Sequence, residues 1–168
     1  MLVNRVLLAF ILEATGRGQE AEQEFRHILE LDDNFHLGWW GLGQSLFARG
    51  ETGEAIRCFE KVYSLAPFET RAVGALAGLL SRTGQNRRAE ELLAKLGPPE
   101  TYSVPLALAM FDLYRGETET AVDWWEKAID QRDPNAVIWP HLAVFEALRA
   151  SPRWPAFAKR MNLPESAW

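Results

Sequence analysis

The chain has 168 residues, of which 48% are hydrophobic and 24% are charged, and its net charge is -5 at pH 7. This composition is typical of an ordered domain, and the negative charge argues against the broad positive surface that holds a nucleic-acid backbone. Leucine and alanine each occur 22 times, whereas valine and isoleucine together number 13. The sequence therefore favours helices over strands and predicts an all-α protein.

The cysteine content and the apolar runs narrow the class further. Cys58 is the only cysteine, so the chain can form no internal disulfide and no cysteine-based metal cluster. The longest apolar run covers residues 6–12, which is far shorter than the roughly 18 to 20 residues of a membrane span. We therefore expect a cytoplasmic protein without a membrane-inserted segment.

Glycines divide most of the chain at nearly even intervals. Gly16, Gly50 and Gly84 are 34 residues apart, and Gly116 follows 32 residues later. Other residue types recur in the same register, as shown by Ala21, Ala55, Ala89 and Ala121, and by Phe25, Phe59, Leu93 and Trp125. Glycine adopts a positive φ easily, so each one suits a tight turn between two amphipathic helices. We predict four helix pairs, in residues 2–35, 36–69, 70–101 and 102–135.

The first predicted helix is unusual. Residues Leu2 to Leu12 carry apolar side chains on nearly every side, so an isolated helix would expose an apolar face to water. Either another helix or domain precedes it in a longer polypeptide, or this face is a homodimer contact. We prefer the first interpretation, because helical arrays normally have a polar cap at both ends.

The second pair carries the most specific motif, which consists of Trp39-x-x-Leu42-Gly43, Leu46, Ala55, Phe59 and Pro67. This pattern resembles the tetratricopeptide repeat. The resemblance extends more loosely over residues 2–35, 70–101 and 102–135. It implies a right-handed solenoid of antiparallel helix pairs, with about four repeats in residues 1–135, that binds a protein or peptide segment in its concave groove.

The regularity fails at two later places. The Gly97-Pro98-Pro99 sequence accounts for the two residues missing between the third and fourth pairs, because consecutive prolines cannot continue a helix. In residues 136–168 we expect C-terminal capping helices, one with Pro140 in its first turn and one that begins at Ser151. Residues 148–164 resemble the tail after the repeats of some bacterial multidomain regulators, such as adenylate cyclases and winged-helix transcription factors.

The groove can be assigned to residues on the first helices. A second apolar stripe lies about 100° from the face that packs inside each pair. Part of this stripe packs between adjacent repeats, and the rest forms the predicted groove. We expect an aromatic wall, a shallow glycine floor and neighbouring arginines, which suit an apolar segment with an acidic residue. The predicted groove residues are Phe10, Trp40, Gln44, Phe47, Arg71, Gly74, Gly78, Arg82 and Met110.

Catalytic chemistry is not expected. His27, His36 and His141 do not show the spacing of a zinc protease, and no pair of titratable groups is placed for acid–base work. We therefore predict a non-catalytic interaction module with no cofactor and no metal. The alternative is a small-molecule sensor whose groove holds an apolar ligand.

Overall fold

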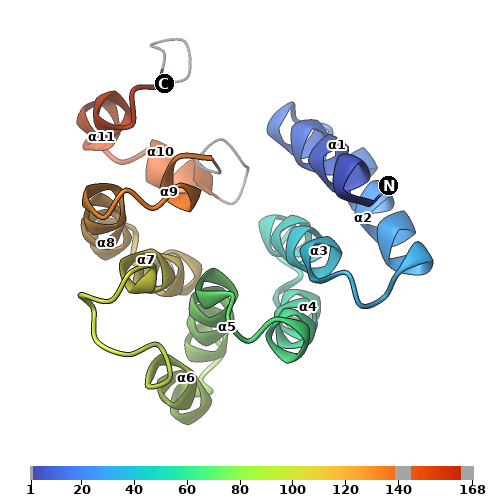
Figure 1. Ribbon diagram of the computed structural model, residues 1–168, viewed down its shortest axis with the longest axis horizontal. Helices are drawn as coiled ribbons and strands as arrows, with labels where there is room; N and C mark the ends of the chain where they lie inside the picture. Colours follow the sequence, from blue (N-terminus) through green and yellow to red (C-terminus); the bar gives the residue numbers. More distant parts are fainter. Residues whose placement is uncertain (1, 139–144, 164–168) are drawn as a thin grey trace. The chain divides into compact units, whose positions relative to one another are not determined.

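The computed structural model describes residues 2–138 and 145–163. Within these ranges every regular element is a helix (Figure 1), which confirms the all-α prediction. The chain divides after Glu69 into two compact units, which are described here one at a time. This division differs from the predicted boundary between repeats at 1–135 and a cap at 136–168, which stays a prediction.

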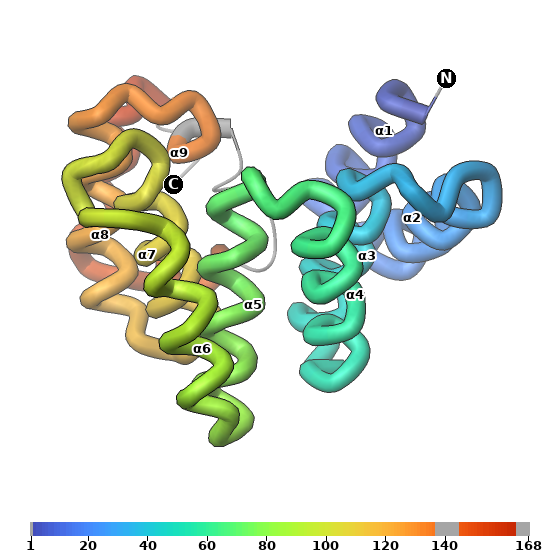
Figure 2. Tube along the Cα trace, turned by 60° about the horizontal axis from the view of Figure 1, so that its bottom comes forward, coloured from blue at the N-terminus to red at the C-terminus, as the bar shows by residue number. Residues whose placement is uncertain are grey.

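The N-terminal unit consists of two helix pairs. They are α1 (Leu2–Ala14) with α2 (Gly18–Leu31), and α3 (His36–Ala48) with α4 (Thr52–Leu65). Within each pair the two helices pack along each other, and α2 also contacts α3 (Figure 2). The elements therefore follow the tetratricopeptide-like order that the sequence pattern predicts.

Glycines end the first helix of each pair, as expected from the sequence. Gly16 and Gly50 adopt φ values of 79° and 83°, and Gly84 and Gly116 in the C-terminal unit adopt 82° and 99°. At Gly50, the amide donates to the carbonyl of Phe47, and the next amide donates to the carbonyl of Leu46 at 2.9 Å. These two bonds satisfy carbonyl groups that the helix end leaves open, so the left-handed residue closes the helix.

Glycines inside α3 have a different role, because they make room for aromatic rings. A Cβ added to Gly43 would lie 2.8 Å from the ring of Phe59 in α4, and one added to Gly41 would overlap the ring of Phe25 in α2. Both rings are fully buried. Phe59 therefore packs onto the first helix of its own pair at Gly43.

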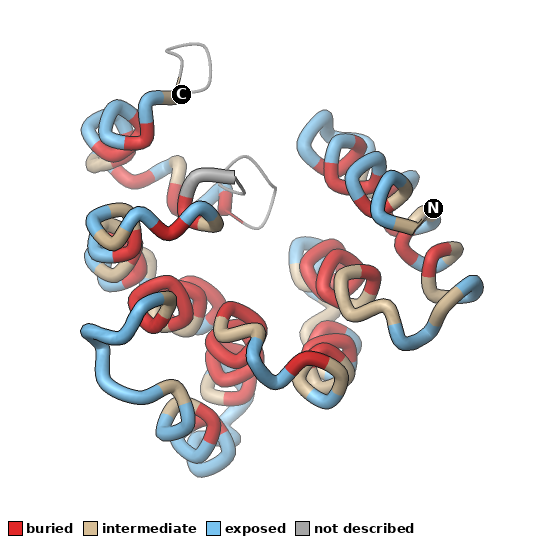
Figure 3. Tube along the Cα trace, in the orientation of Figure 1, coloured by how far each residue is buried: buried red, intermediate tan, exposed pale blue. Residues whose placement is uncertain are grey.

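The C-terminal unit begins with α5 (Thr70–Arg82), which packs against both α6 (Asn86–Leu93) and α7 (Val104–Arg115). Helix α5 is buried along most of its length (Figure 3). The connection between α6 and α7 spans residues 94–103 and contains the two prolines. It is longer than the connection between α4 and α5, because α6 ends early and the prolines keep the chain out of a helix.

Helix α8 (Thr118–Asp130) carries the last apolar face of the repeats, and later segments cover it. The ring of Trp125 contacts Phe145 at 5.1 Å and Phe157 at 6.4 Å between centroids, and its indole N–H donates to the carbonyl of Ala136 at 2.9 Å. Short helices follow at α9 (Asn135–Ile138), α10 (Glu146–Arg149) and α11 (Trp154–Arg160). This packing supports the predicted capping role.

The expected start of the last capping helix lies close to its observed start. The Ser151 hydroxyl accepts a hydrogen bond from the Arg153 amide at 3.3 Å, one residue before α11 begins. Arg153 then donates to Asp123 of α8 at 2.6 Å and lies 3.1 Å from Glu126. Ion pairs thus attach α11 to the polar side of α8. The predicted helix start at Pro140 lies outside the described residues.

Candidate functional site

The predicted groove residues fall in both compact units. Four lie in the N-terminal unit, and the other five lie in the C-terminal unit. A continuous groove across both units therefore stays a prediction. Of the nine residues, Arg82 is exposed, Phe47 is half-buried, and the others are buried: Phe10, Trp40, Gln44, Arg71, Gly74, Gly78 and Met110.

The predicted aromatic wall needs correction. Phe10 is 5% exposed and its ring meets the ring of Phe25 edge-on at 5.1 Å. Trp40 is 3% exposed, and its ring centroid is 5.3 Å from that of Phe59. Both rings thus contact a ring on the second helix of their own pair, although helical periodicity assigned them to a separate stripe. Of the three residues predicted to form the wall, Phe10, Trp40 and Phe47, only Phe47 is partly exposed to solvent.

The predicted glycine floor is wrong at both of its positions. A Cβ added to Gly74 would lie 1.9 Å from the carbonyl oxygen of Ala107, and one added to Gly78 would lie 2.5 Å from that of Phe111. Both glycines therefore face the backbone of α7. One close helix contact explains both, because residues at i and i+4 share a helical face. Met110, also on α7, is fully buried.

The predicted polar residues of the groove differ in burial. Gln44 is fully buried in α3, and within the part of the chain that the structure describes neither its side-chain oxygen nor its nitrogen has a hydrogen-bond partner. Arg71 is buried near the start of α5, whereas Arg82 is exposed at its end. Arg82 is thus the predicted cation that remains at the surface.

A small pocket in the N-terminal unit was not predicted. It has a volume of about 210 Å³ and lies where α1 and α3 end and α2 begins. We name it the Glu13 pocket after its most unusual residue. Its lining residues are Glu13, Gly16, Gly18, Ser45, Ala48 and Arg49.

Glu13 is a buried acid that lies near the end of α1 and is 6% exposed. Its Oε1 accepts a hydrogen bond from the Ser45 hydroxyl at 2.9 Å, while its Oε2 is buried and has no hydrogen-bond partner among the described residues. Burial raises the pKa of Glu13 from 4.5 to about 7, because it disfavours the charged form, and the Ser45 hydrogen bond opposes this shift. Glu13 therefore titrates close to neutral pH.

One signal in the sequence could have identified this acid. Glu13 directly follows the apolar run at residues 6–12, and it occupies the register of Phe47 in the next repeat. A charged residue at an apolar position of a packed face is informative because carboxylates are seldom buried.

Comparison with known proteins identifies the repeats. A tetratricopeptide repeat family model matches residues 46–102, which include α4, α5 and α6. Residues 46–102 therefore contain a tetratricopeptide repeat. No curated protein matches the sequence closely enough to count as a relative. Tetratricopeptide repeats generally mediate protein–protein interaction, and the family is typically non-catalytic.

The described residues offer neither a metal site nor a membrane-spanning helix. Among residues 2–138 and 145–163, no three His, Cys, Asp or Glu side chains gather where they could hold a metal ion. His27 lies 3.4 Å from Glu30, and His36 lies between the rings of Phe35 and Phe68. In the same part of the chain, none of the helices is both long enough and apolar enough to cross a membrane.

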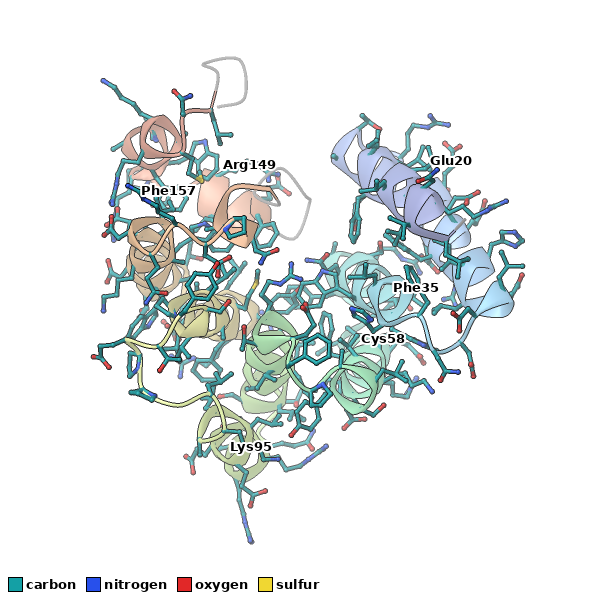
Figure 4. The ribbon with its side chains drawn as sticks, viewed as in Figure 1. Glu20, Phe35, Cys58, Lys95, Arg149 and Phe157 are labelled. Atoms are coloured by element: carbon teal, nitrogen blue, oxygen red, sulfur yellow. The ribbon has the colours of Figure 1, made fainter. Side chains whose placement is uncertain are left out.

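We expect the single thiol of the repeats to react slowly. Cys58 lies on α4 (Figure 4) and is 3% exposed, and burial raises its pKa from 9.0 to about 11. Since the thiolate is the reactive form, its population at neutral pH falls by about 100-fold. Ellman's reagent should modify the folded protein at least 100-fold more slowly than the protein unfolded in guanidinium chloride. Equal rates would show that α4 opens freely.

Proposed function

We propose that this chain is a non-catalytic interaction module that holds a protein or peptide segment along the first helices of its repeats, within a larger bacterial regulator. The observation that carries the proposal is the tetratricopeptide match over residues 46–102 together with the helix pairs. The regulator context rests on the resemblance of residues 148–164 alone.

The accessible surface of the first helices is smaller than the sequence predicted. Phe47 on α3 is half-buried and Arg82 at the end of α5 is exposed, so both can contact a partner. An aromatic side chain and an arginine are the residue types that most often carry binding energy at interfaces. The alternative of an apolar ligand in an aromatic and glycine-lined cavity has lost its support, because those rings and glycines pack against neighbouring helices.

The outer face of α1 is the second contact surface of the proposal. Val3, Leu7, Leu8 and Ile11 are 55%, 50%, 47% and 60% exposed. Such a cluster of large apolar side chains is typical of an interaction surface. It would be covered by a preceding helix or domain of a longer polypeptide, or by a second copy of the chain.

Affinity purification from the source cell, followed by direct binding of the purified partner, tests the proposed function. We expect the double variant Phe47→Ala/Arg82→Ala to bind this partner at least tenfold more weakly, because it removes both accessible groups of the first helices. Arg87→Ala is the control, since the Arg87 side chain is 92% exposed on α6.

Circular dichroism must show the same helical content in all three proteins. A partner that binds the double variant as tightly as the wild type would contradict the proposed surface. Failure to find any protein that binds directly would contradict the proposed function itself.

A further inference from the structure

The Glu13 pocket presents an acceptor whose hydrogen-bonding capacity is largely unused. An ionised carboxylate offers about four lone-pair sites, and Glu13 receives one hydrogen bond, from Ser45. Its Oε2 is covered by the surrounding protein and receives no hydrogen bond from residues 2–138 or 145–163. The site therefore favours a ligand that donates hydrogen bonds.

The charged side chains around the pocket favour a cationic ligand. Arg49, the cation that lines the pocket, is already paired with Glu22 and Glu51. When Glu13 is ionised, four carboxylates in this region face three guanidinium groups. The carboxylates are those of Glu13, Glu20 (Figure 4), Glu22 and Glu51. The guanidinium groups are those of Arg17, Arg26 and Arg49. The excess negative charge disfavours an anionic ligand.

We infer that the Glu13 pocket binds one alkylammonium or guanidinium group, with the Glu13 carboxylate as its acceptor. The group would be the end of a lysine or arginine side chain in the bound segment, and this origin rests on the proposed function. Gly16, Gly18 and Ala48 leave the pocket open, because a Cβ added to either glycine would meet no atom within 4 Å. The inference adds a basic residue to the expected partner.

Binding of the cation is coupled to ionisation of Glu13. The elements that pack against α1 are α2 and α3, whose charged groups near the pocket are Arg17, Glu20, Glu22, Arg26 and Arg49; Glu51, just before α4, pairs with Arg49. Burial and the Ser45 hydrogen bond are the causes of the raised pKa of Glu13. The cation needs the ionised carboxylate, so its affinity rises as pH increases through about 7.

Titration with n-butylammonium, the end of a lysine side chain, tests the site on the whole chain. Two probes separate charge from hydrogen bonding: 1-butanol lacks the charge, and tetramethylammonium lacks an N–H donor. NMR reports on the carboxyl carbon of Glu13 and the amide of Ser45 at constant ionic strength. We expect saturable shifts with n-butylammonium that far exceed those with either control, and tighter binding at about pH 8 than at about pH 6.

Glu13→Gln keeps the shape of the side chain but removes the charge, and it should weaken the affinity at least tenfold. Glu30→Gln makes the same charge change at a side chain that is 75% exposed, and should leave the affinity unchanged. Any one of three results would overturn the inference. The first is an equal response to n-butylammonium and tetramethylammonium, and the second is an equal loss of n-butylammonium affinity in the two variants. The third is the absence of a chemical-shift change at Glu13 and Ser45.

The same variants distinguish this inference from the proposed function. If an identified protein partner binds Glu13→Gln as tightly as the wild type, the partner does not place a basic group in the pocket, and the proposed function stands. If n-butylammonium binds but no protein partner exists, the pocket is a site for a free amine and the proposed function fails.

Discussion

Replacing Glu13 by glutamine should stabilise the protein by about 3 kcal/mol at about pH 8 and change its stability little at about pH 4. The pKa of Glu13 is about 7 in the folded protein, above its ordinary value of 4.5. At low pH the carboxyl is protonated in both the folded and unfolded states, so its burial carries no charge penalty. Between the two pKa values the unfolded chain releases the proton while the folded protein keeps it.

The wild type therefore loses stability as pH rises from 4.5 to about 7, and the loss levels off above the folded pKa. Each pH unit in this interval costs about 1.4 kcal/mol, which gives the total of about 3 kcal/mol. Glutamine does not titrate and can still accept the Ser45 hydrogen bond. The free energy of unfolding of the Glu13→Gln variant therefore lacks this pH-dependent loss.

Urea unfolding of both proteins at several pH values measures the effect. The difference between the two free energies of unfolding should grow with pH, because the contributions of other titrating groups cancel in it. Glu30→Gln, at an exposed position, should change the free energy of unfolding much less than Glu13→Gln does at about pH 8. Parallel curves for Glu13→Gln and the wild type would show that Glu13 is not buried as a neutral acid.

The sequence predicted the repeat architecture because its evidence came from local constraints that recur. A turn glycine needs a positive φ wherever it occurs, and Gly16, Gly50, Gly84 and Gly116 all have one. The small row on the second helices is buried throughout, and the large row is buried except at Leu93, which is half-buried. A pattern that repeats in register averages out the variation of any one position.

The site was predicted less well, because periodicity tells which residues share a helical face but not how far a neighbour reaches across it. Trp40 was assigned to an open stripe, yet Gly43 beside it lets the ring of Phe59 approach and Trp40 packs on that ring. The sequence analysis missed Glu13 for a related reason. Its hydrogen-bond partner, Ser45, is 32 residues away, and no sequence pattern marks Ser45 as the partner of an acid.

The largest loss of stability should follow from Gly74→Ala. The new methyl group would lie 1.9 Å from the carbonyl oxygen of Ala107, where no real Cβ contact is that short. The obstructing atom belongs to the backbone of α7, so no side-chain rotation can relieve the overlap. Helices α5 and α7 must separate, and the buried residues between them lose packing. We expect destabilisation of about 3 kcal/mol or more, with a fall in Tm of about 10 °C.

Two further glycine variants make this prediction specific. Gly78→Ala meets the carbonyl of Phe111 at 2.5 Å and the Cβ of Tyr114 at 2.9 Å, so its loss should be smaller. Gly53→Ala, in the first turn of α4, meets no atom within 4 Å and should leave stability unchanged or raise it by up to about 1 kcal/mol.

Thermal unfolding followed by circular dichroism ranks the three variants. The ranking itself is the test, because helix propensity alone favours alanine at every one of these positions. Equal stability of Gly74→Ala and Gly53→Ala would mean that α5 and α7 do not approach as closely as the structure shows. The glycines would then be available to line a groove, and the glycine floor expected from the sequence would return.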